Sequence, residues 1–279
     1  MVLLIALIGF GGCKKEAPGG AATAGLPPLM QPHPAQGDPA KLVMPAVLAH
    51  VPADTPYLLA GLDTMPPEVF VRFQQAMAPL FGMASAAWQR ERATSKMLDA
   101  ILSELDGKWS EAGIESLGLS AQPRFAVYGL GLQPVVARMA VKDDKAVQAT
   151  IARIAAKAGE VLPPMSTKDG RNYWRHDDTA KGASFVIALA DNQVIFAGGK
   201  TADVDAKLGL ILGIDKPPQS MADGALIKQL MARHGFGGQM IGFVDSQRTV
   251  RAALEAAGAA PTPACTSEVD RMTATLPRV

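Results

Sequence analysis

The stretch Ala183–Ala197, ASFVIALADNQVIFA, contains two apolar runs separated by the dipeptide Asp191-Asn192. Asp and Asn both tolerate the positive φ that the central residues of a type I′ turn require, so the stretch predicts a β-hairpin. The first run, Phe185–Ala190, is apolar throughout and does not alternate with polar residues. We therefore expect this strand to lie inside a sheet, with both of its faces covered.

A second hairpin is predicted by Phe125–Gly131 and Pro134–Val141, which flank a glycine-containing turn. Elsewhere apolar residues recur at helical spacing, which predicts helices over residues 66–82, 83–105, 145–157, 201–212, 222–234 and 248–257. Antiparallel hairpins interrupted by helices are typical of the α+β class. We predict an antiparallel or mixed sheet with packed helices, for which duplicated ferredoxin-like strand-helix modules are one candidate arrangement.

Three apolar strands each run into an aspartate that precedes a helical pattern. The aspartates are Asp63, Asp143 and Asp245. A carboxylate at this position accepts hydrogen bonds from the free N–H groups of the first helical turn and lies at the positive end of the helix dipole. We interpret all three as structural helix caps. A catalytic role would require two of them to converge in one cleft.

Residues 2–10 form an apolar run with one glycine, and Gly11-Gly12-Cys13-Lys14-Lys15 follows directly. At about 1.5 Å per residue, the run covers only about half of a hydrocarbon core of about 30 Å, so it is too short for a transmembrane helix. Small residues before a cysteine, after such a run, make residues 1–13 resemble a bacterial lipoprotein signal peptide. The alternatives are a general secretory signal with an unmodified cysteine and a buried first strand.

The resemblance implies that residues 1–12 are removed and that Cys13 becomes the N-terminus, carrying diacylglycerol and a further acyl chain such as palmitate. Two or three acyl chains give stable anchorage, whereas one does not. In the sorting pattern of Gram-negative lipoproteins, Lys14 implies the outer membrane, facing the periplasm. Residues 13–45 contain seven of the chain's 21 prolines. This composition predicts a flexible tether.

The folded part is expected over residues 46–279, as one domain or as two lobes that divide near residue 120. Three stretches in it resemble uncharacterised envelope proteins of proteobacteria, which are families of unknown function. The stretches are Val51–Tyr57, Tyr128–Val135 and Gly242–Asp245. This resemblance supports an envelope location and implies no activity.

Composition and motifs give no sign of catalysis. The balance of 27 basic and 26 acidic side chains argues against a nucleic-acid binder. The nucleophile pattern G-x-S-x-G does not occur, and the four histidines lack the spacing of metal ligands. We therefore expect no cofactor and no metal, and an enzyme is the less favoured class. Glu104 is expected on a solvated helix face. If Cys13 carries lipid, Cys265 has no partner cysteine in this sequence, and it is then buried, paired with another chain, or paired with a residue missing from this sequence.

One polar cluster stands apart from these patterns. It consists of Tyr173, Trp174, Arg175, His176 and Asp178. We interpret it as a candidate contact surface, and a weak metal or acid–base site is a second interpretation. An exposed strand end followed by a turn would gather the same residue types without any function.

Three functions remain open. The first is a lipid-anchored, non-enzymatic interaction or structural module, held at the membrane by its lipid and with an envelope protein as candidate partner. The second is a carrier or chaperone of an apolar ligand, because the chain has 13 methionines and methionine packs adaptably around irregular shapes. The third is a hydrolase of envelope polymers, which requires Asp143, Asp245 or His176 to share a polar cleft.

Overall fold

A computed structural model describes residues 43–64, 96–108, 110–160, 162–234 and 238–256, together with Ser267, Asp270 and Arg271. All of these belong to Pro34–Val279, the larger of two units into which the chain divides. Cys13, Lys14, Cys265 and the helix expected over residues 66–82 lie outside the described residues. Among the described helices, none has the length and apolar character needed to cross a membrane.

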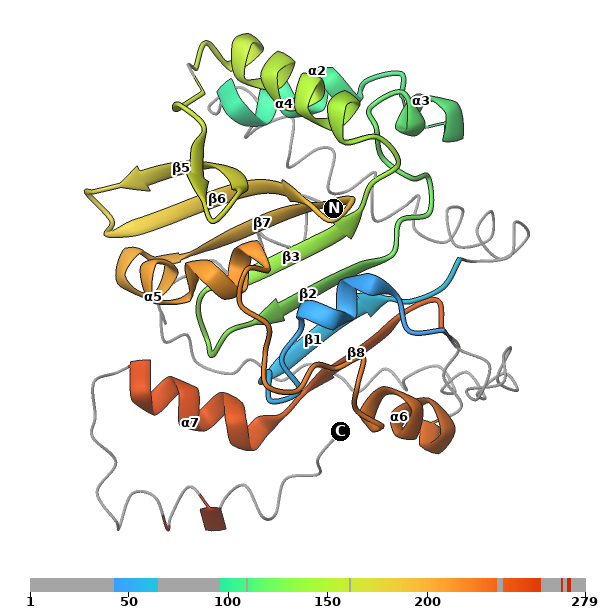
Figure 1. Ribbon diagram of the computed structural model, residues 1–279, viewed down its shortest axis with the longest axis vertical. Coiled ribbons are helices and arrows are strands. Elements are labelled where there is room, and N and C mark those ends of the chain that lie inside the picture. The colour runs from blue at the N-terminus through green and yellow to red at the C-terminus, as the bar shows by residue number, and fades with distance from the viewer. Residues whose placement is uncertain are drawn as a thin grey trace, which may run out of the picture. The chain divides into compact units, whose positions relative to one another are not determined.

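One eight-stranded sheet forms the centre of the fold, in the order β4-β5-β6-β7-β3-β2-β1-β8 (Figure 1). The strands are β1 (Tyr57–Gly61), β2 (Phe125–Gly129), β3 (Val135–Ala140), β4 (Ser166–Lys168), β5 (Arg171–Asp178), β6 (Ala183–Ala190), β7 (Gln193–Lys200) and β8 (Ile241–Val244). Neighbouring strands are antiparallel throughout this sheet. Helices accompany this antiparallel sheet, and the α+β class is confirmed.

Both predicted hairpins are present as β2–β3 and β6–β7. Asp191 and Asn192 both have φ near 55°, as a type I′ turn requires. As expected, β6 lies inside the sheet, between β5 and β7, and apolar clusters pack on both of its faces; Phe185, which is 52% exposed, is the exception. One face of β6 packs into the larger core. On the other face, neighbouring residues do not cover the end of the strand at which Phe185 lies.

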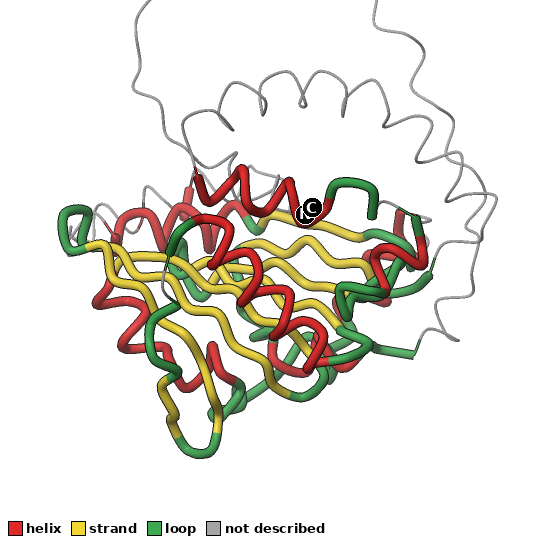
Figure 2. The backbone as a smooth tube through the Cα atoms, turned by 90° about the horizontal axis from the view of Figure 1, so that it is seen from above, coloured by secondary structure: helices red, strands yellow, loops and turns green. Residues whose placement is uncertain are grey.

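Helices lie on both sides of the sheet (Figure 2). They are the 3-10 helix η4 (Ala46–His50), α2 (Lys96–Leu105), α3 (Glu111–Glu115), α4 (Asp144–Ala158), α5 (Thr201–Leu212), α6 (Leu226–His234) and α7 (Ser246–Ala256). Val147 of α4 packs with Met139 and Val194 on one face of the sheet. The helices η4, α5 and α6 contribute to a larger core on the other face.

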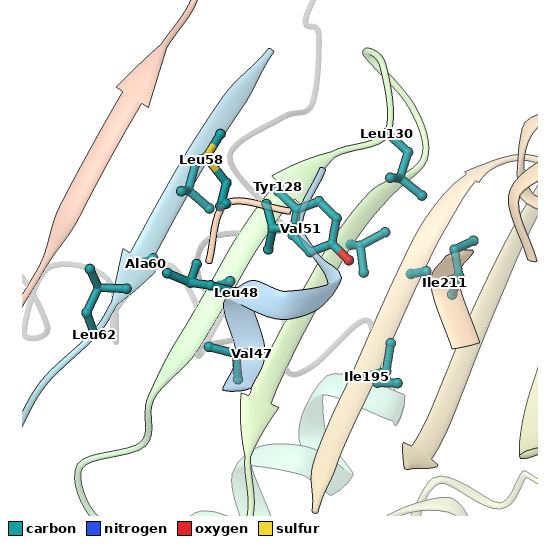
Figure 3. Close-up of a cluster of buried hydrophobic side chains, with 14 of the residues drawn as sticks. Val47, Leu48, Val51, Leu58, Ala60, Leu62, Tyr128, Leu130, Ile195 and Ile211 are labelled. Carbon is teal, nitrogen blue, oxygen red and sulfur yellow. The ribbon is translucent and has the colours of Figure 1, made fainter. Parts of the chain in front are cut away.

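The larger core is built where η4 crosses the strands. Val47, Leu48 and Val51 are at most 1% exposed and lie against the side chains of β1 and β2 (Figure 3). Burying a side chain of this kind contributes roughly 1.5–3 kcal/mol. The chain segment before β1 is thereby fixed against the sheet, and with it the loop that leads into β1.

The strand order differs from that of duplicated ferredoxin-like modules, in which a β-α-β-β-α-β unit is repeated. Here β1–β3 and β4–β7 are two antiparallel meanders that join through the pairing of β3 with β7. The helix after β3 and the helix after β7 also lie on opposite faces of the sheet. The sheet is continuous across residue 120, since strands from both sides of that position belong to it.

Candidate functional site

The predicted contact cluster lies on β5, and the strand separates its members. Side chains alternate between the two faces of a strand, so Tyr173 and Arg175 share one face, while Trp174, His176 and Asp178 share the other. Tyr173 packs against the larger core, and Trp174 is buried at 8% exposure. The five side chains therefore do not form one contact surface.

Arg175 instead connects three elements of the fold. Its Nε lies 2.7 Å from Oδ1 of Asp177, and its Nη1 lies 2.5 Å from Oδ1 of Asp205 on α5. Ser184 on β6 donates a hydrogen bond to Asp177 at 2.5 Å. Hydrogen bonds from Ser184 and Arg175 lower the pKa of Asp177. Within the described part of the chain, no group of three or more metal-ligating side chains occurs.

Two of the three predicted caps accept hydrogen bonds at helix starts. Oδ1 of Asp143 accepts from the backbone N–H of Lys145 and Ala146 at the start of α4. Oδ1 of Asp245 accepts from the N–H of Arg248 at 3.0 Å at the start of α7. Asp63 accepts from the N–H of Thr64, and the helix expected after it lies outside the described residues.

The caps do not share a cleft. Asp143 follows the end of β3, and the strand registers place this end of the sheet beside Gly61, the last residue of β1. Asp245 follows Val244, which pairs with Tyr57 at the other end of β1. Asp143 and Asp245 therefore lie at opposite ends of the sheet and do not converge.

A pocket of about 450 Å³ opens at the end of the sheet where β2 turns into β3. Figure 1 shows this turn between α5 and α7. The pocket is lined by Pro52, Asp54, Thr55, Pro56, Gly129, Leu130, Gly131, Lys207, Leu210, Pro217, Pro218, Arg248, Arg251 and Ala252. These residues come from five separate segments of the chain, so no local motif marks the pocket in the sequence.

The floor of the pocket depends on close backbone packing. A Cβ atom on Gly129 would lie 2.3 Å from the carbonyl oxygen of Gly131 and 2.7 Å from the ring of Tyr57, so only glycine fits there. Thr55 donates from Oγ1 to the carbonyl of Gly129 at 2.7 Å. Lys207 on α5 donates to the carbonyl of Leu130 and holds the β2–β3 turn against the helix.

The charges that line the pocket are unbalanced, although two further carboxylates, those of Asp245 and Asp270, contact the arginines from outside the lining. The lining carries three cations, Lys207, Arg248 and Arg251, and one carboxylate, that of Asp54. Arg248 and Arg251 are three residues apart on α7 and therefore project from the same side of the helix. Since the pocket is otherwise lined mainly by apolar side chains and backbone, it presents positive charge beside an apolar surface.

Both arginines are partly held by neighbours. Arg248 donates from Nη1 to the carbonyl of Ala53 at 3.0 Å, and its Nε lies 3.5 Å from Asp245. Arg251 donates from Nη2 to Oδ1 of Asp270 at 2.6 Å. A guanidinium has five N–H donors, and those contacts leave donors on each arginine available to a ligand.

Sequence reasoning missed two buried charged groups. Arg138 is 1% exposed and lies beneath the end of α5; its only signal was a single charged residue within the apolar stretch Val135–Val141. Glu104 was expected in solvent, and that expectation is wrong, because it is 2% exposed. Lys108, Arg153 and Lys157 lie 2.6–2.9 Å from its carboxylate, so Glu104 joins α2 to α4.

Comparisons of the chain with protein-family models, with curated proteins and with solved structures find no match.

Proposed function

We propose that this chain is a lipid-anchored envelope protein that acts as a non-enzymatic binding module, with the pocket between α5 and α7 as its binding site. The observation that carries the proposal is the lining of the pocket, in which three cations stand beside apolar walls. Among the described lining residues, the titratable groups are the three cations and Asp54.

Several residues in the walls of the pocket have a restricted backbone conformation. Four of the lining residues are prolines, at positions 52, 56, 217 and 218. Proline fixes its own φ, so these walls lose little conformational entropy when a ligand binds. The hydrogen bond from Arg248 to Ala53 likewise holds one wall to α7. A preorganised hollow of this kind supports recognition of a ligand.

The proposed location is the periplasmic face of the outer membrane. Its support is the resemblance of residues 1–13 to a lipoprotein signal, the lysine at position 14, and the proline-rich stretch 13–45. The described fold begins at Val43, close to the end of that stretch. The module would then be anchored by acyl chains on Cys13 and connected to them by a flexible tether.

A carrier of an apolar ligand is the second candidate, and the apolar walls of the same pocket favour it. Leu130, Leu210 and Ala252 line the hollow together with the prolines. The methionine content gives this candidate less support, since Met221 and Met231 are buried in the larger core. An interaction module and a carrier differ in what occupies the pocket.

The location is tested by metabolic labelling with a lipid precursor, followed by membrane fractionation, for the native chain and for Cys13→Ser. We expect the native chain to carry label and to remain with the membrane. The variant should lose the label and appear in the soluble periplasmic fraction. Unchanged labelling and fractionation of the variant would contradict the lipid anchor.

The binding site is tested by placing a photo-crosslinking residue at Pro218, an exposed position on the pocket rim, in living cells. The control carries the same residue at Arg233, which is exposed on α6 and does not line the pocket. We expect adducts from position 218 alone, and Arg251→Glu should reduce them. The proposal would be contradicted if both positions gave equal amounts of adduct, or if Arg251→Glu left the amount of adduct from position 218 unchanged.

A further inference from the structure

We propose that the ligand of this pocket is a single-chain amphiphilic carboxylate, whose head is held by Arg248 and Arg251 and whose alkyl chain lies on the proline and leucine walls. The inference rests on the proposed binding function, because it assumes that the pocket is a binding site. It adds the chemical class of the ligand.

The first step is the sign of the charge. Three cations and one carboxylate line the hollow itself, and the carboxylates of Asp245 and Asp270, which contact the two arginines, are not part of the lining. The charges that face the hollow therefore favour an anion over a cation. Lys207 has its ammonium directed to the carbonyls of Leu130 and Gln133. Arg248 and Arg251 retain N–H donors that these contacts do not use, so the arginines are the groups available to the head of the ligand.

The second step is the type of anion. Arg251 already binds one carboxylate oxygen, that of Asp270, at 2.6 Å. Its planar guanidinium offers parallel N–H donors that match the two oxygens of a carboxylate. The contact between Arg251 and Asp270 is thus of the same kind as the contact that we assign to the carboxylate head of the ligand.

The third step concerns the chemical character of the rest of the ligand, beyond its charged head. Pro52, Pro56, Leu130, Leu210 and Pro218 surround the space beside the arginines, and a polar body would find few hydrogen-bond partners there. Apolar surface buried on these walls contributes roughly 25 cal/mol per Å². A volume of about 450 Å³ lies within the range of small-ligand pockets, about 300–1,000 Å³. An unbranched alkyl chain supplies apolar surface that can follow an open hollow.

The test measures binding by calorimetry to the full chain carrying Cys13→Ser, which avoids detergent. Four probes separate head from chain: octanoate, octanol, octylammonium and acetate. We expect saturable binding of octanoate, with octanol and octylammonium at least about tenfold weaker, because a charge-assisted hydrogen bond accounts for about a tenfold change in affinity. Acetate should not saturate over the same range, because it lacks the alkyl chain.

Variants then locate the binding. Arg248→Gln and Arg251→Gln should each weaken octanoate binding about tenfold, again by loss of charge-assisted hydrogen bonds. Arg233→Gln on α6 is the matched control and should leave it unchanged. The proposal is overturned if octanol binds as tightly as octanoate, if no probe binds, or if the two pocket variants behave like the control. A peptide acid that binds where octanoate does not would also overturn it.

The two proposals fail separately. In one outcome, octanoate binds and binding depends on the arginines, but position 218 gives no crosslinks in cells. This outcome would support the ligand class and contradict the proposed function in the envelope. Crosslinks that require Arg251, without octanoate binding, would support the binding function and overturn the ligand class.

Discussion

Arg138 donates a hydrogen bond from Nη2 to the carbonyl oxygen of Ile211 at 2.7 Å, although the arginine is 1% exposed. The same guanidinium donates to Tyr128 Oη, Gln193 Oε1 and the carbonyl of Leu210. Carbonyls in the last turn of a helix lack helical partners and carry partial negative charge, so a cation is favourable there. Since Leu210 also lines the pocket, Arg138 fixes one pocket wall to β3.

Replacement of Arg138 should therefore destabilise the fold strongly. Arg138→Met keeps an unbranched apolar side chain but removes the side-chain donor to the carbonyl of Ile211 and one of two donors to the carbonyl of Leu210, which also accepts from the N–H of Gly213. We expect a loss of about 3 kcal/mol in the free energy of unfolding, measured by urea denaturation. Tyr128→Phe, which removes one hydroxyl, should cost about 1 kcal/mol. Equal losses for the two variants would show that the buried cation is not the dominant contribution.

His50 should make the stability depend on pH. Burial and the nearby charge of Arg138 lower its pKa from 6.5 to about 4, while Asp191 opposes this and Arg171 and Lys216 add to it. The unfolded chain thus binds a proton more readily than the folded chain. The contribution of His50 is present above pH 6.5 and is lost as the pH falls from 6.5 towards 4.

The expected loss over this range is about 2 kcal/mol, measured by denaturation at a series of pH values. His50→Gln should flatten the pH dependence between 6.5 and 4. The exposed His176 provides the control, since His176→Gln should keep the slope of the native chain. A native chain whose stability is constant over this window would contradict the depressed pKa, as would a His50 titration by NMR centred near 6.5.

Glu104 should contribute to the packing of α2 on α4. Burial opposes its charge, but hydrogen bonds from Lys157, Lys108 and Arg153 outweigh burial and lower its pKa to about 2. Removal of the charge leaves the three cations without their shared partner. Glu104→Gln should cost about 2–3 kcal/mol, with faster amide hydrogen exchange in α2.

The exposed Glu111 at the start of α3 supplies the matched control, because Glu111→Gln should change stability by less than about 0.5 kcal/mol. The dependence of stability on pH in acid gives a second test of the contribution of Glu104. With a folded pKa near 2 and an ordinary value of 4.5, the contribution of Glu104 is present above pH 4.5 and is lost as the pH falls towards 2. Unchanged exchange in α2 for Glu104→Gln would argue against this ion-pair group.

Gly129 should tolerate no side chain. A Cβ atom there meets the carbonyl oxygen of Gly131 at 2.3 Å, and the backbone would have to shift at the pocket floor. Gly129→Ala should destabilise the fold by about 2 kcal/mol in urea denaturation and weaken ligand binding. Gly224→Ala is the control, since its Cβ would meet only the carbonyl of Ser220, at 3.7 Å. If the two variants unfold alike, the packing at Gly129 is looser than described.

Local features were predictable because the forces that create them act between near neighbours in the chain. The β6–β7 hairpin follows from Asp191 and Asn192, which accept positive φ, and the start of α4 follows from the carboxylate of Asp143. Glu104 shows the opposite case. Its spacing from Lys108 is ordinary for an exposed helix, whereas Arg153 and Lys157, which bury it, lie 49 and 53 residues further on.

The sequence by itself determined the α+β class, the two hairpins and the caps at Asp143 and Asp245, because periodicity and turn chemistry operate over a few residues. Tertiary structure alone decided the strand order, the burial of Arg138 and the pocket, because each depends on contacts between segments far apart in the chain. The pairing of β3 with β7 brings the turn after β2 beside α5. No pattern within either segment specifies that encounter, and the cationic pocket exists only through it.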